Sequence, residues 1–124
     1  MSHRHHPPSV RSFAGVRYNV SRVGNLAPLL CPPYDIISPE QQHDLHRRSP
    51  HNMIRLEYPL PTAEDAGDEL ARYRKAAVTY QTWLREGVLV RDVAPALYVH
   101  DHSFTYRGRS HVRRGFVVAV RLRP

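Results

Sequence analysis

Residues 31–40 read CPPYDIISPE and fix the local course of the chain more tightly than any other stretch. Two consecutive prolines hold φ at about −65° and remove two backbone donors, so these residues are excluded from a helix interior or a central strand. Ser38, Pro39 and Gln41 have the pattern of a helix N-terminus: an N-cap, a proline at the first helical position and the partner of a capping box. The stretch therefore predicts a stiff corner that leads directly into a helix.

A phenol and a carboxylate lie on this corner, at Tyr34 and Asp35. A rigid turn that presents two such groups at the start of a helix suits ligand binding, although the residue types alone do not select the ligand. The corner is therefore the first candidate site in the chain.

The composition is that of a globular protein of one domain. The chain has 124 residues, of which 41% are hydrophobic and 23% charged, and such a chain can bury about two-thirds of its unfolded surface. No apolar run approaches the ~20 residues of a membrane span, and the N-terminus lacks the apolar segment of a signal peptide. The single cysteine, Cys31, has no internal disulfide partner, which is typical of a reducing compartment. We expect a cytoplasmic protein without a membrane partner, with a disordered arm over residues 1–11 and a single domain over 12–124.

The net charge of +7 is concentrated at the two ends of the chain. Residues 1–30 contain four arginines and no acid, residues 31–91 contain eight basic and nine acidic groups, and residues 92–124 contain six arginines against two acids. Binding to nucleic acid needs a contiguous basic face. Because the sequence does not show one, we do not expect nucleic acid as a partner.

Hydrophobic periodicity predicts an α+β fold. Strands are expected at 13–18, 53–58, 88–91, 96–106 and 111–122, and the last two form a C-terminal hairpin around a glycine turn at 107–110. The strand at 111–122 is apolar on both faces, so it should be buried on both sides.

Two helices complete the predicted fold. A short one covers 39–48, and a long amphipathic one covers 64–86, with Leu70, Tyr73, Ala77, Tyr80 and Leu84 on its buried face. We expect one mixed, mainly antiparallel sheet of about five strands with the long and the short helix packed against it.

The histidine and cysteine positions do not indicate a metal site or a nucleophile. The pairs His43/His46 and His100/His102 have spacings that metal sites use, but no third ligand stands at a supporting distance in the sequence. The prolines beside Cys31 supply no N–H groups to stabilise a thiolate, so a packed thiol is expected. The sequence also lacks a glycine-rich phosphate loop and the G-x-S-x-G, C-x-x-C and H-E-x-x-H motifs.

Five segments in a fixed order resemble the N-terminal part of the bacterial and archaeal family called domain of unknown function 1015. They are FAGVRY at 13–18, PPYDIISPE at 32–40, SPHNMIRL at 49–56, WLREGVLVRD at 83–92 and PALYV at 95–99. The resemblance extends over roughly residues 12–122 and so covers nearly the whole chain.

This resemblance implies a chemistry that the residues alone do not. Longer members of the family carry a downstream Gly-His-His-Arg-Tyr segment that is similar to the nucleotide-binding motif of the ParB and sulfiredoxin superfamily, which includes free-serine kinases. It implies phosphate or nucleotide chemistry on a small hydroxyl substrate such as serine, with ATP, ADP or pyrophosphate and Mg in the complete protein. Because the segment is missing here, the resemblance implies the N-terminal part of a kinase-like phosphotransferase, incomplete without a complementary C-terminal domain.

Within this hypothesis the corner supplies the catalytic groups. Asp35 orients or deprotonates the substrate hydroxyl, Tyr34 donates a hydrogen bond beside it, and Arg17 neutralises phosphate. Pro33 and Ser38 belong to the substrate- and phosphate-binding wall. Three alternatives stay open: a corner that only shapes and caps the chain, a binding module without catalysis for nucleic acid or a protein partner, and a remnant that does not fold alone.

Overall fold

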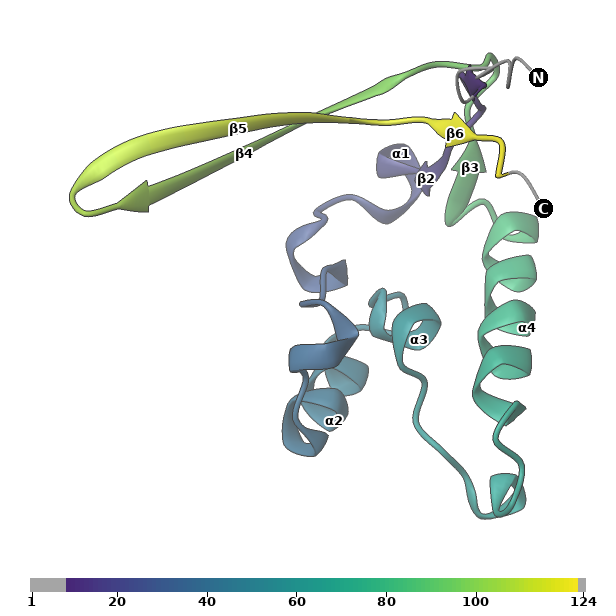
Figure 1. The fold of residues 1–124 in the computed structure, drawn as a ribbon. Helices are drawn as coiled ribbons and strands as arrows, with labels where there is room; N and C mark the ends of the chain where they lie inside the picture. Colours follow the sequence, from purple (N-terminus) through teal and green to yellow (C-terminus); the bar gives the residue numbers. More distant parts are fainter. Residues whose placement is uncertain (1–8, 123–124) are drawn as a thin grey trace, which may run out of the picture. The chain divides into compact units, whose positions relative to one another are not determined.

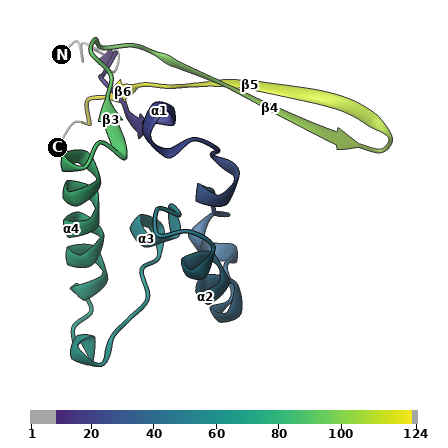
Figure 2. The same cartoon turned by 180° about the vertical axis from the view of Figure 1, so that it is seen from behind.

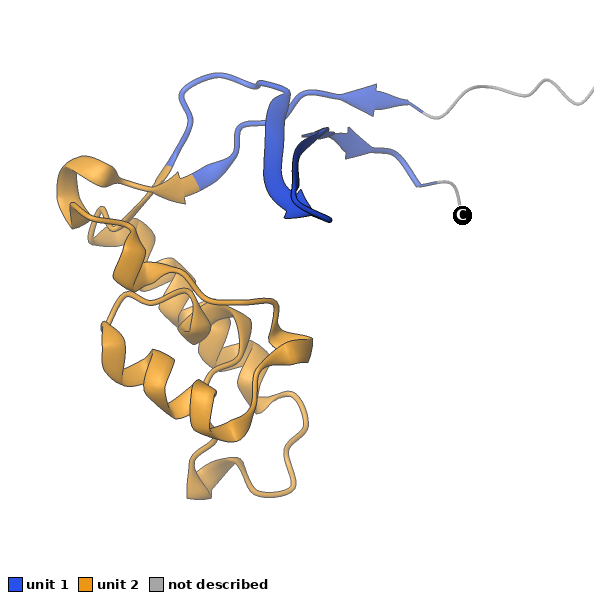
Figure 3. Ribbon diagram, turned by 90° about the vertical axis from the view of Figure 1, so that its left-hand side faces the viewer, with its two compact units in different colours: residues 1–16, 91–124 blue, residues 17–90 orange. Residues whose placement is uncertain are grey.

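The computed structural model describes residues 9–122 and groups the chain into two compact units (Figure 3). Unit 1 consists of residues 1–16 and 91–124, and unit 2 of residues 17–90. The predicted α+β class is confirmed. A single domain over 12–124 stays a prediction. Of the expected N-terminal arm, residues 1–8 lie outside the described residues, whereas Val10–Arg11 form strand β1.

Unit 2 contains the helices. They are α1 (Val20–Val23), α2 (Pro39–Arg48), α3 (Ile54–Glu57) and α4 (Ala71–Arg85), with 3₁₀ turns η1 (Ala27–Leu29), η2 (Tyr34–Ile36) and η3 (Ala63–Asp65). Helix α3 contacts both α2 and α4, and it lies between them in the ribbon views (Figures 1 and 2). None of the helices described between residues 9 and 122 combines the length and the apolar character needed to cross a bilayer.

Helix α2 forms as its sequence predicts. The Ser38 hydroxyl accepts a hydrogen bond from the Gln41 backbone N–H at 3.2 Å, and the Gln41 side chain accepts one from the Ser38 N–H at 2.9 Å. Pro39 occupies the first turn, where its missing N–H costs nothing. The capping box is therefore confirmed, and it fixes the direction in which the corner enters the helix.

The strand predicted at 53–58 is wrong, because Ile54–Glu57 form helix α3. The side chain of Asn52 accepts a hydrogen bond from the Ile54 N–H at 2.9 Å, a local bond that favours a turn over an extended chain. Ile54 is fully buried and Glu57 is exposed, so a short helix also separates apolar from charged residues. Over four residues, an alternation of apolar and polar side chains does not distinguish a strand from a short helix.

The long helix predicted over 64–86 is shorter at its N-terminus than expected. Gly67 has a φ of +79°, a left-handed conformation that ends the η3 turn, and α4 begins only at Ala71. Its buried face also differs from the prediction, since Tyr73 is 57% exposed while Ala71 and Trp83 are buried. The C-terminal glycine signal is confirmed: Gly87 has a φ of +74°.

The core of unit 2 is small and mostly aliphatic. Its most deeply buried side chains are Leu29, Leu45, Ile54, Ala71, Trp83, Val88 and Leu89. Trp83 packs against the rings of Tyr18, at 6.1 Å between centroids, and of His51, at 5.6 Å. Each fully buried aliphatic side chain contributes roughly 2 kcal/mol to stability, so few such positions carry most of the stability of this unit.

Unit 1 contains the predicted C-terminal hairpin. Strand β4 (Tyr98–Tyr106) pairs antiparallel with β5 (Arg109–Val117), and Arg107 and Gly108 form the turn with φ of +48° and +73°. Positive φ at both turn residues is the geometry that matches the twist of a two-residue hairpin. The hairpin is therefore confirmed, as one long two-stranded ribbon (Figure 1).

The single sheet of about five strands is not formed. Within residues 9–122 the strands make three two-stranded sheets: β1 with β6 (Ala119–Val120), β2 (Val16–Tyr18) with β3 (Leu89–Arg91), and β4 with β5. The strand predicted at 13–18 is shortened to β2, and Phe13 makes an isolated bridge to Ala96. The expected burial of 111–122 on both sides is also wrong, since Phe116 is 71% exposed and Leu122 is 86% exposed.

Candidate functional site

The Pro-Pro corner is a short turn locked onto the start of α2. Pro33 has φ −55° and ψ 141°, and η2 follows with hydrogen bonds from the Ile36 N–H to the Pro33 carbonyl and from the Ile37 N–H to the Tyr34 carbonyl. Tyr34 is 59% exposed and Asp35 is exposed. The corner thus presents its phenol and its carboxylate to solvent, as the sequence predicts.

Asn52 holds the chain that leads into the corner. This fully buried side chain donates hydrogen bonds to the carbonyls of Pro28, at 2.9 Å, and of Leu30, at 3.0 Å. The Met53 N–H donates to the Leu29 carbonyl between them, at 2.7 Å. Three consecutive carbonyls are therefore tied to the start of α3, which fixes the position of the corner relative to that helix.

Tyr18 adds a second anchor to the same region. Its hydroxyl donates to the carbonyl of His51 at 2.6 Å. Burial, with a smaller effect of the Cys31 thiolate charge, raises the pKa of Tyr18 to about 12. Tyr18 therefore stays a neutral hydrogen-bond donor throughout the physiological pH range, and its role here is structural.

A hollow of about 400 Å³ lies against the corner. Its lining includes Cys31, Pro33, Tyr34 and Asp35 from the corner, and Met53 and Glu57 from the start and end of α3. Both of its charged groups are carboxylates, so it is electronegative. Burial, followed by the charge of Glu57, raises the pKa of the Cys31 thiol, which keeps it protonated and a poor nucleophile.

A second hollow of about 280 Å³ shares Tyr34 and Glu57 with the first. Its other lining residues include Arg72 and Tyr73, from the first turn of α4. The Arg72 guanidinium donates to the Tyr73 hydroxyl at 2.7 Å and lies 4.7 Å from the centroid of that ring. The hydrogen bond to Tyr73 is the largest cause of a raised pKa of Arg72, to which Tyr34 also contributes. A guanidinium that hydrogen-bonds to Tyr73 therefore lines the hollow that shares Tyr34 with the acidic one.

One protein family matches almost the whole chain. The family model described as "Protein of unknown function (DUF1015)" matches residues 10–124. The chain belongs to the DUF1015 family. No curated protein and no solved structure is significantly similar to it.

The structure brings together part of the site predicted for this DUF1015 protein. Pro33, Tyr34 and Asp35 line the first hollow, whereas Ser38 lines neither hollow and serves as the N-cap of α2. Arg17 lies on β2 with an exposed side chain and lines neither hollow. The roles given to these five residues stay predictions.

Arg72 and Glu57 are the site residues that sequence reasoning missed. The predicted helical pattern placed Tyr73, the neighbour of Arg72, on the buried face of the helix, whereas Tyr73 is exposed. The pattern therefore gave no reason to expect Arg72 at a site. Glu57 was assigned to a strand that does not form. The sequence contains no local signal for either, since each reaches the corner only through the packing of α3 and α4.

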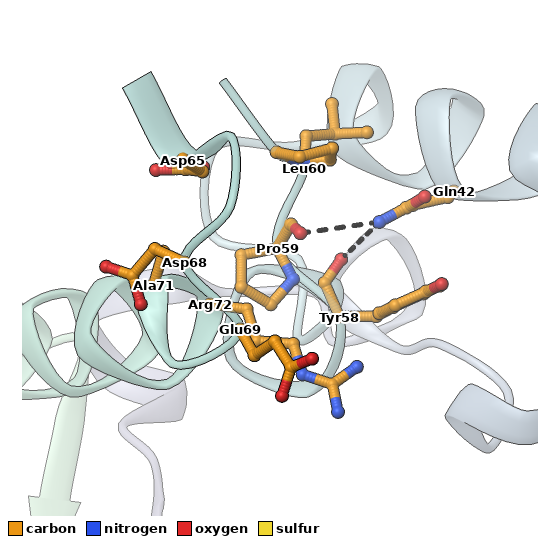
Figure 4. Close-up of a pocket in the computed structure, with 10 residues that line it drawn as sticks. Gln42, Tyr58, Pro59, Leu60, Asp65, Asp68, Glu69, Ala71 and Arg72 are labelled. Atoms are coloured by element: carbon orange, nitrogen blue, oxygen red, sulfur yellow. Dashed lines mark hydrogen bonds between the residues drawn. The ribbon is translucent and has the colours of Figure 1, made fainter. Parts of the chain in front are cut away.

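A third hollow of about 500 Å³ extends from Arg72 toward the loop before α4 (Figure 4). Gln42, which is 7% exposed, donates from its side chain to the carbonyls of Tyr58, at 2.9 Å, and Pro59, at 3.4 Å. Three acids line this hollow: Asp65, Asp68 and Glu69. Asp65 is paired with Lys75 and Asp68 with Arg74, so most of this charge is already neutralised.

Metal ligands are not clustered in the part of the chain that the structure describes. Between residues 9 and 122 no group of three or more His, Cys, Asp or Glu side chains is positioned to hold a metal ion. Nε2 of His46, in the tautomer that carries its proton, donates to the Tyr58 carbonyl at 3.4 Å, and burial lowers the pKa of His46. His100 and His102 stand side by side on the β4–β5 ribbon, with ring centroids 6.3 Å apart.

Proposed function

We propose that the Tyr34–Asp35 corner and Arg72 form one wall of a binding site for a small phosphate-bearing molecule. The observation that carries the proposal is the place of Tyr34, which lines both an acidic hollow, with Asp35 and Glu57, and a hollow with the Arg72 cation. Phosphoryl transfer to a hydroxyl needs these two environments next to each other: a carboxylate for the hydroxyl proton and a cation for the transferred phosphate.

In this proposal each group has one task. Asp35 orients or deprotonates the hydroxyl of a serine-like substrate, Tyr34 hydrogen-bonds between substrate and phosphate, and Arg72 neutralises phosphate charge. Arg17 was given the last task from sequence, and Arg72 takes it here because it lines the hollow that Tyr34 shares. Glu57 lines both hollows, whereas Arg72 lines only the second, so the proposal puts the phosphate beside Arg72.

The proposal describes part of a site. Its kinase-like character rests on the resemblance, which also supplies the likeness to the ParB and sulfiredoxin superfamily and the cofactors ATP, ADP or pyrophosphate with Mg. The cytoplasmic setting is proposed from the sequence, which has a single cysteine and no signal-peptide segment. The nucleotide-handling segment of that resemblance does not occur among these 124 residues. We propose that a complementary C-terminal domain provides it, since catalysis by proximity needs both walls.

The test is pyrophosphate binding by the full chain, measured by isothermal titration calorimetry. Arg72→Gln should weaken binding roughly tenfold, the effect of losing one charge-assisted hydrogen bond. Arg85→Gln is the matched control, because Arg85 lies on the same helix but lines neither hollow. Asp35→Asn should leave pyrophosphate affinity equal or higher, since it removes a repelling charge. Equal losses for the two arginine variants, or no heat with pyrophosphate, would refute the site.

The alternative function, a binding module without catalysis, requires an exposed surface and not a hollow. The β4–β5 ribbon in unit 1 offers such a surface. The ribbon contributes no residue to the two hollows beside Tyr34, and the chemistry of its side chains favours one class of partner.

A further inference from the structure

The β4–β5 ribbon has two faces of different chemistry. Its register pairs Tyr98 with Val117 and Tyr106 with Arg109, so residues alternate strictly between the faces. One face, here called the ring face, consists of the even-numbered residues of β4 and the odd-numbered residues of β5. The other, here called the apolar face, consists of the odd-numbered residues of β4 and the even-numbered residues of β5.

Aromatic side chains form a continuous row along the ring face. The ring of His102 lies 5.6 Å from that of Phe104, which stacks on His111 across the ribbon at 5.3 Å with an interplanar angle of 19°. Tyr106 continues the row at 6.5 Å from His111. Phe104 is 38% exposed and Tyr106 is 57% exposed. The ribbon therefore presents flat ring surfaces to solvent.

Positive charge accompanies these rings without a carboxylate on the same face. Arg109 and Arg113 belong to the ring face by register, and the guanidinium of Arg107, in the turn, lies 5.2 Å from the centroid of the Tyr106 ring. The ribbon's carboxylate, Asp101, is on the apolar face, where Arg114 donates to it at 2.8 and 3.1 Å. The hydrogen bond from Arg114 lowers the pKa of Asp101, so this pair is ionised and charge is compensated on that face.

Exposed apolar side chains that a folded protein partner would bury gather instead on the apolar face. Val99 is 69% exposed, Val112 63% and Phe116 71%. The ring face has an aliphatic residue only at its root, at Val117. A second copy of the chain is disfavoured as its occupant, because arginines would face arginines.

We propose that the ring face binds single-stranded nucleic acid. Bases stack on the exposed rings of Phe104 and Tyr106, and phosphates are neutralised by Arg109 and Arg113. The sequence alone did not show which arginines near the C-terminal end of the chain share one face. The hairpin register places two of them, Arg109 and Arg113, on one face with the aromatic residues, which gives the basic surface that such binding needs.

The test is fluorescence anisotropy of labelled oligothymidine with the full chain at low salt. Phe104→Ala should weaken binding about tenfold, the loss expected for one stacked base, whereas Phe116→Ala, on the apolar face, should not. Arg113→Gln should reduce the slope of log K against log salt by about 0.7, the value for one phosphate contact with a single strand. Arg114→Gln, its neighbour on the apolar face, should leave the slope unchanged.

Several outcomes would overturn this proposal. They are absence of binding at low salt, equal losses for Phe104→Ala and Phe116→Ala, and tighter binding of a duplex than of the single strand. Circular dichroism of each variant separates loss of binding from loss of the hairpin. A variant that keeps the wild-type spectrum and loses affinity only on the ring face supports the proposal.

Discussion

Asn52 is the residue on which the geometry of the corner most depends. It is fully buried and uses its amide for two hydrogen bonds to the loop before Cys31 and for one to the start of α3. A polar side chain is tolerated in a core when its hydrogen bonds are satisfied. The structural role of Asn52 could not be predicted from the sequence, because the carbonyls that accept its hydrogen bonds, at Pro28 and Leu30, are more than twenty positions away.

Replacing Asn52 by alanine should destabilise the protein by about 3 kcal/mol, since two part-buried carbonyls and one buried N–H lose their partner. Asn25→Ala is the control, because Asn25 is exposed and makes one local bond to the Ala27 N–H. Urea unfolding followed by tryptophan fluorescence would measure both. A loss below about 1 kcal/mol for Asn52→Ala, within the range of one ordinary hydrogen bond, would show that Asn52 does not hold the loop.

The Asp65–Lys75 ion pair gives stability a defined dependence on pH. The hydrogen bond from Lys75, with a further one from the Thr62 N–H, lowers the pKa of Asp65 below its ordinary value of 3.8. Because the folded pKa is the lower one, the pair stabilises the fold above pH 3.8, and this stabilisation is lost as the pH falls through the folded pKa. Lys75→Met should therefore differ most from wild type near neutral pH and least in strong acid. A stability difference that stayed constant across this range would contradict the role of the pair.

Arg72 and Arg17 show how far the candidate site could be predicted. The corner itself follows from local chemistry, since prolines and a capping box act within a few residues of each other. The cation beside it depends on how α4 packs, which the helical pattern did not predict, since Tyr73 is exposed. The sequence assigns the phosphate contact to Arg17, which does not line the hollow that Tyr34 shares with Arg72, and the role of Arg17 stays a prediction.

Among the elements, helix α2 and the β4–β5 hairpin formed as predicted, whereas helix α4, which also has a strong helical pattern, begins only at Ala71. Helix α2 has a complete capping box, and the β4–β5 hairpin has a glycine turn between two long alternating segments. Helix α3 and the turn η3 are too short for periodicity to identify them. At α3 the side chain of Asn52 accepts a hydrogen bond from the Ile54 N–H, and η3 lies between a capping box of Thr62 and Asp65 and the positive φ of Gly67.

A close approach between elements in unit 1 makes Gly15 sensitive to substitution. The Gly15 N–H donates to the Tyr98 hydroxyl at 2.6 Å, and a Cβ added at Gly15 would lie 2.7 Å from that oxygen and 2.8 Å from Cζ of the ring. Gly15→Ala should therefore cost about 1 to 3 kcal/mol, the usual cost of overpacking.

Gly115→Ala provides the matched control for Gly15. A Cβ at Gly115 would meet nothing within 4 Å, so the change should be neutral or slightly stabilising in a strand. Thermal unfolding of both variants measures the difference. If both alanines had the same effect, the close contact between Gly15 and Tyr98 would not exist in solution.

For the molecule as a whole, hydrophobic periodicity predicted the α+β class but not how the strands combine. Pairs such as Val10 with Val120 join residues at opposite ends of the chain, and no local pattern encodes which partner a strand finds. The two-stranded sheets leave large apolar side chains exposed, including Phe116 and Leu122. The same pairing gathers arginines and rings on one ribbon face, which charge counts along the sequence did not reveal.

The proposed function places phosphate between Tyr34 and Arg72. It is tested most directly by titrating the ¹⁵N-labelled full chain with pyrophosphate and following the backbone amide resonances by NMR. The account predicts saturable shifts at Tyr34, Glu57 and Arg72 that disappear in Arg72→Gln. Shifts confined to Arg17 or to the β4–β5 ribbon, with the corner unchanged, would contradict it.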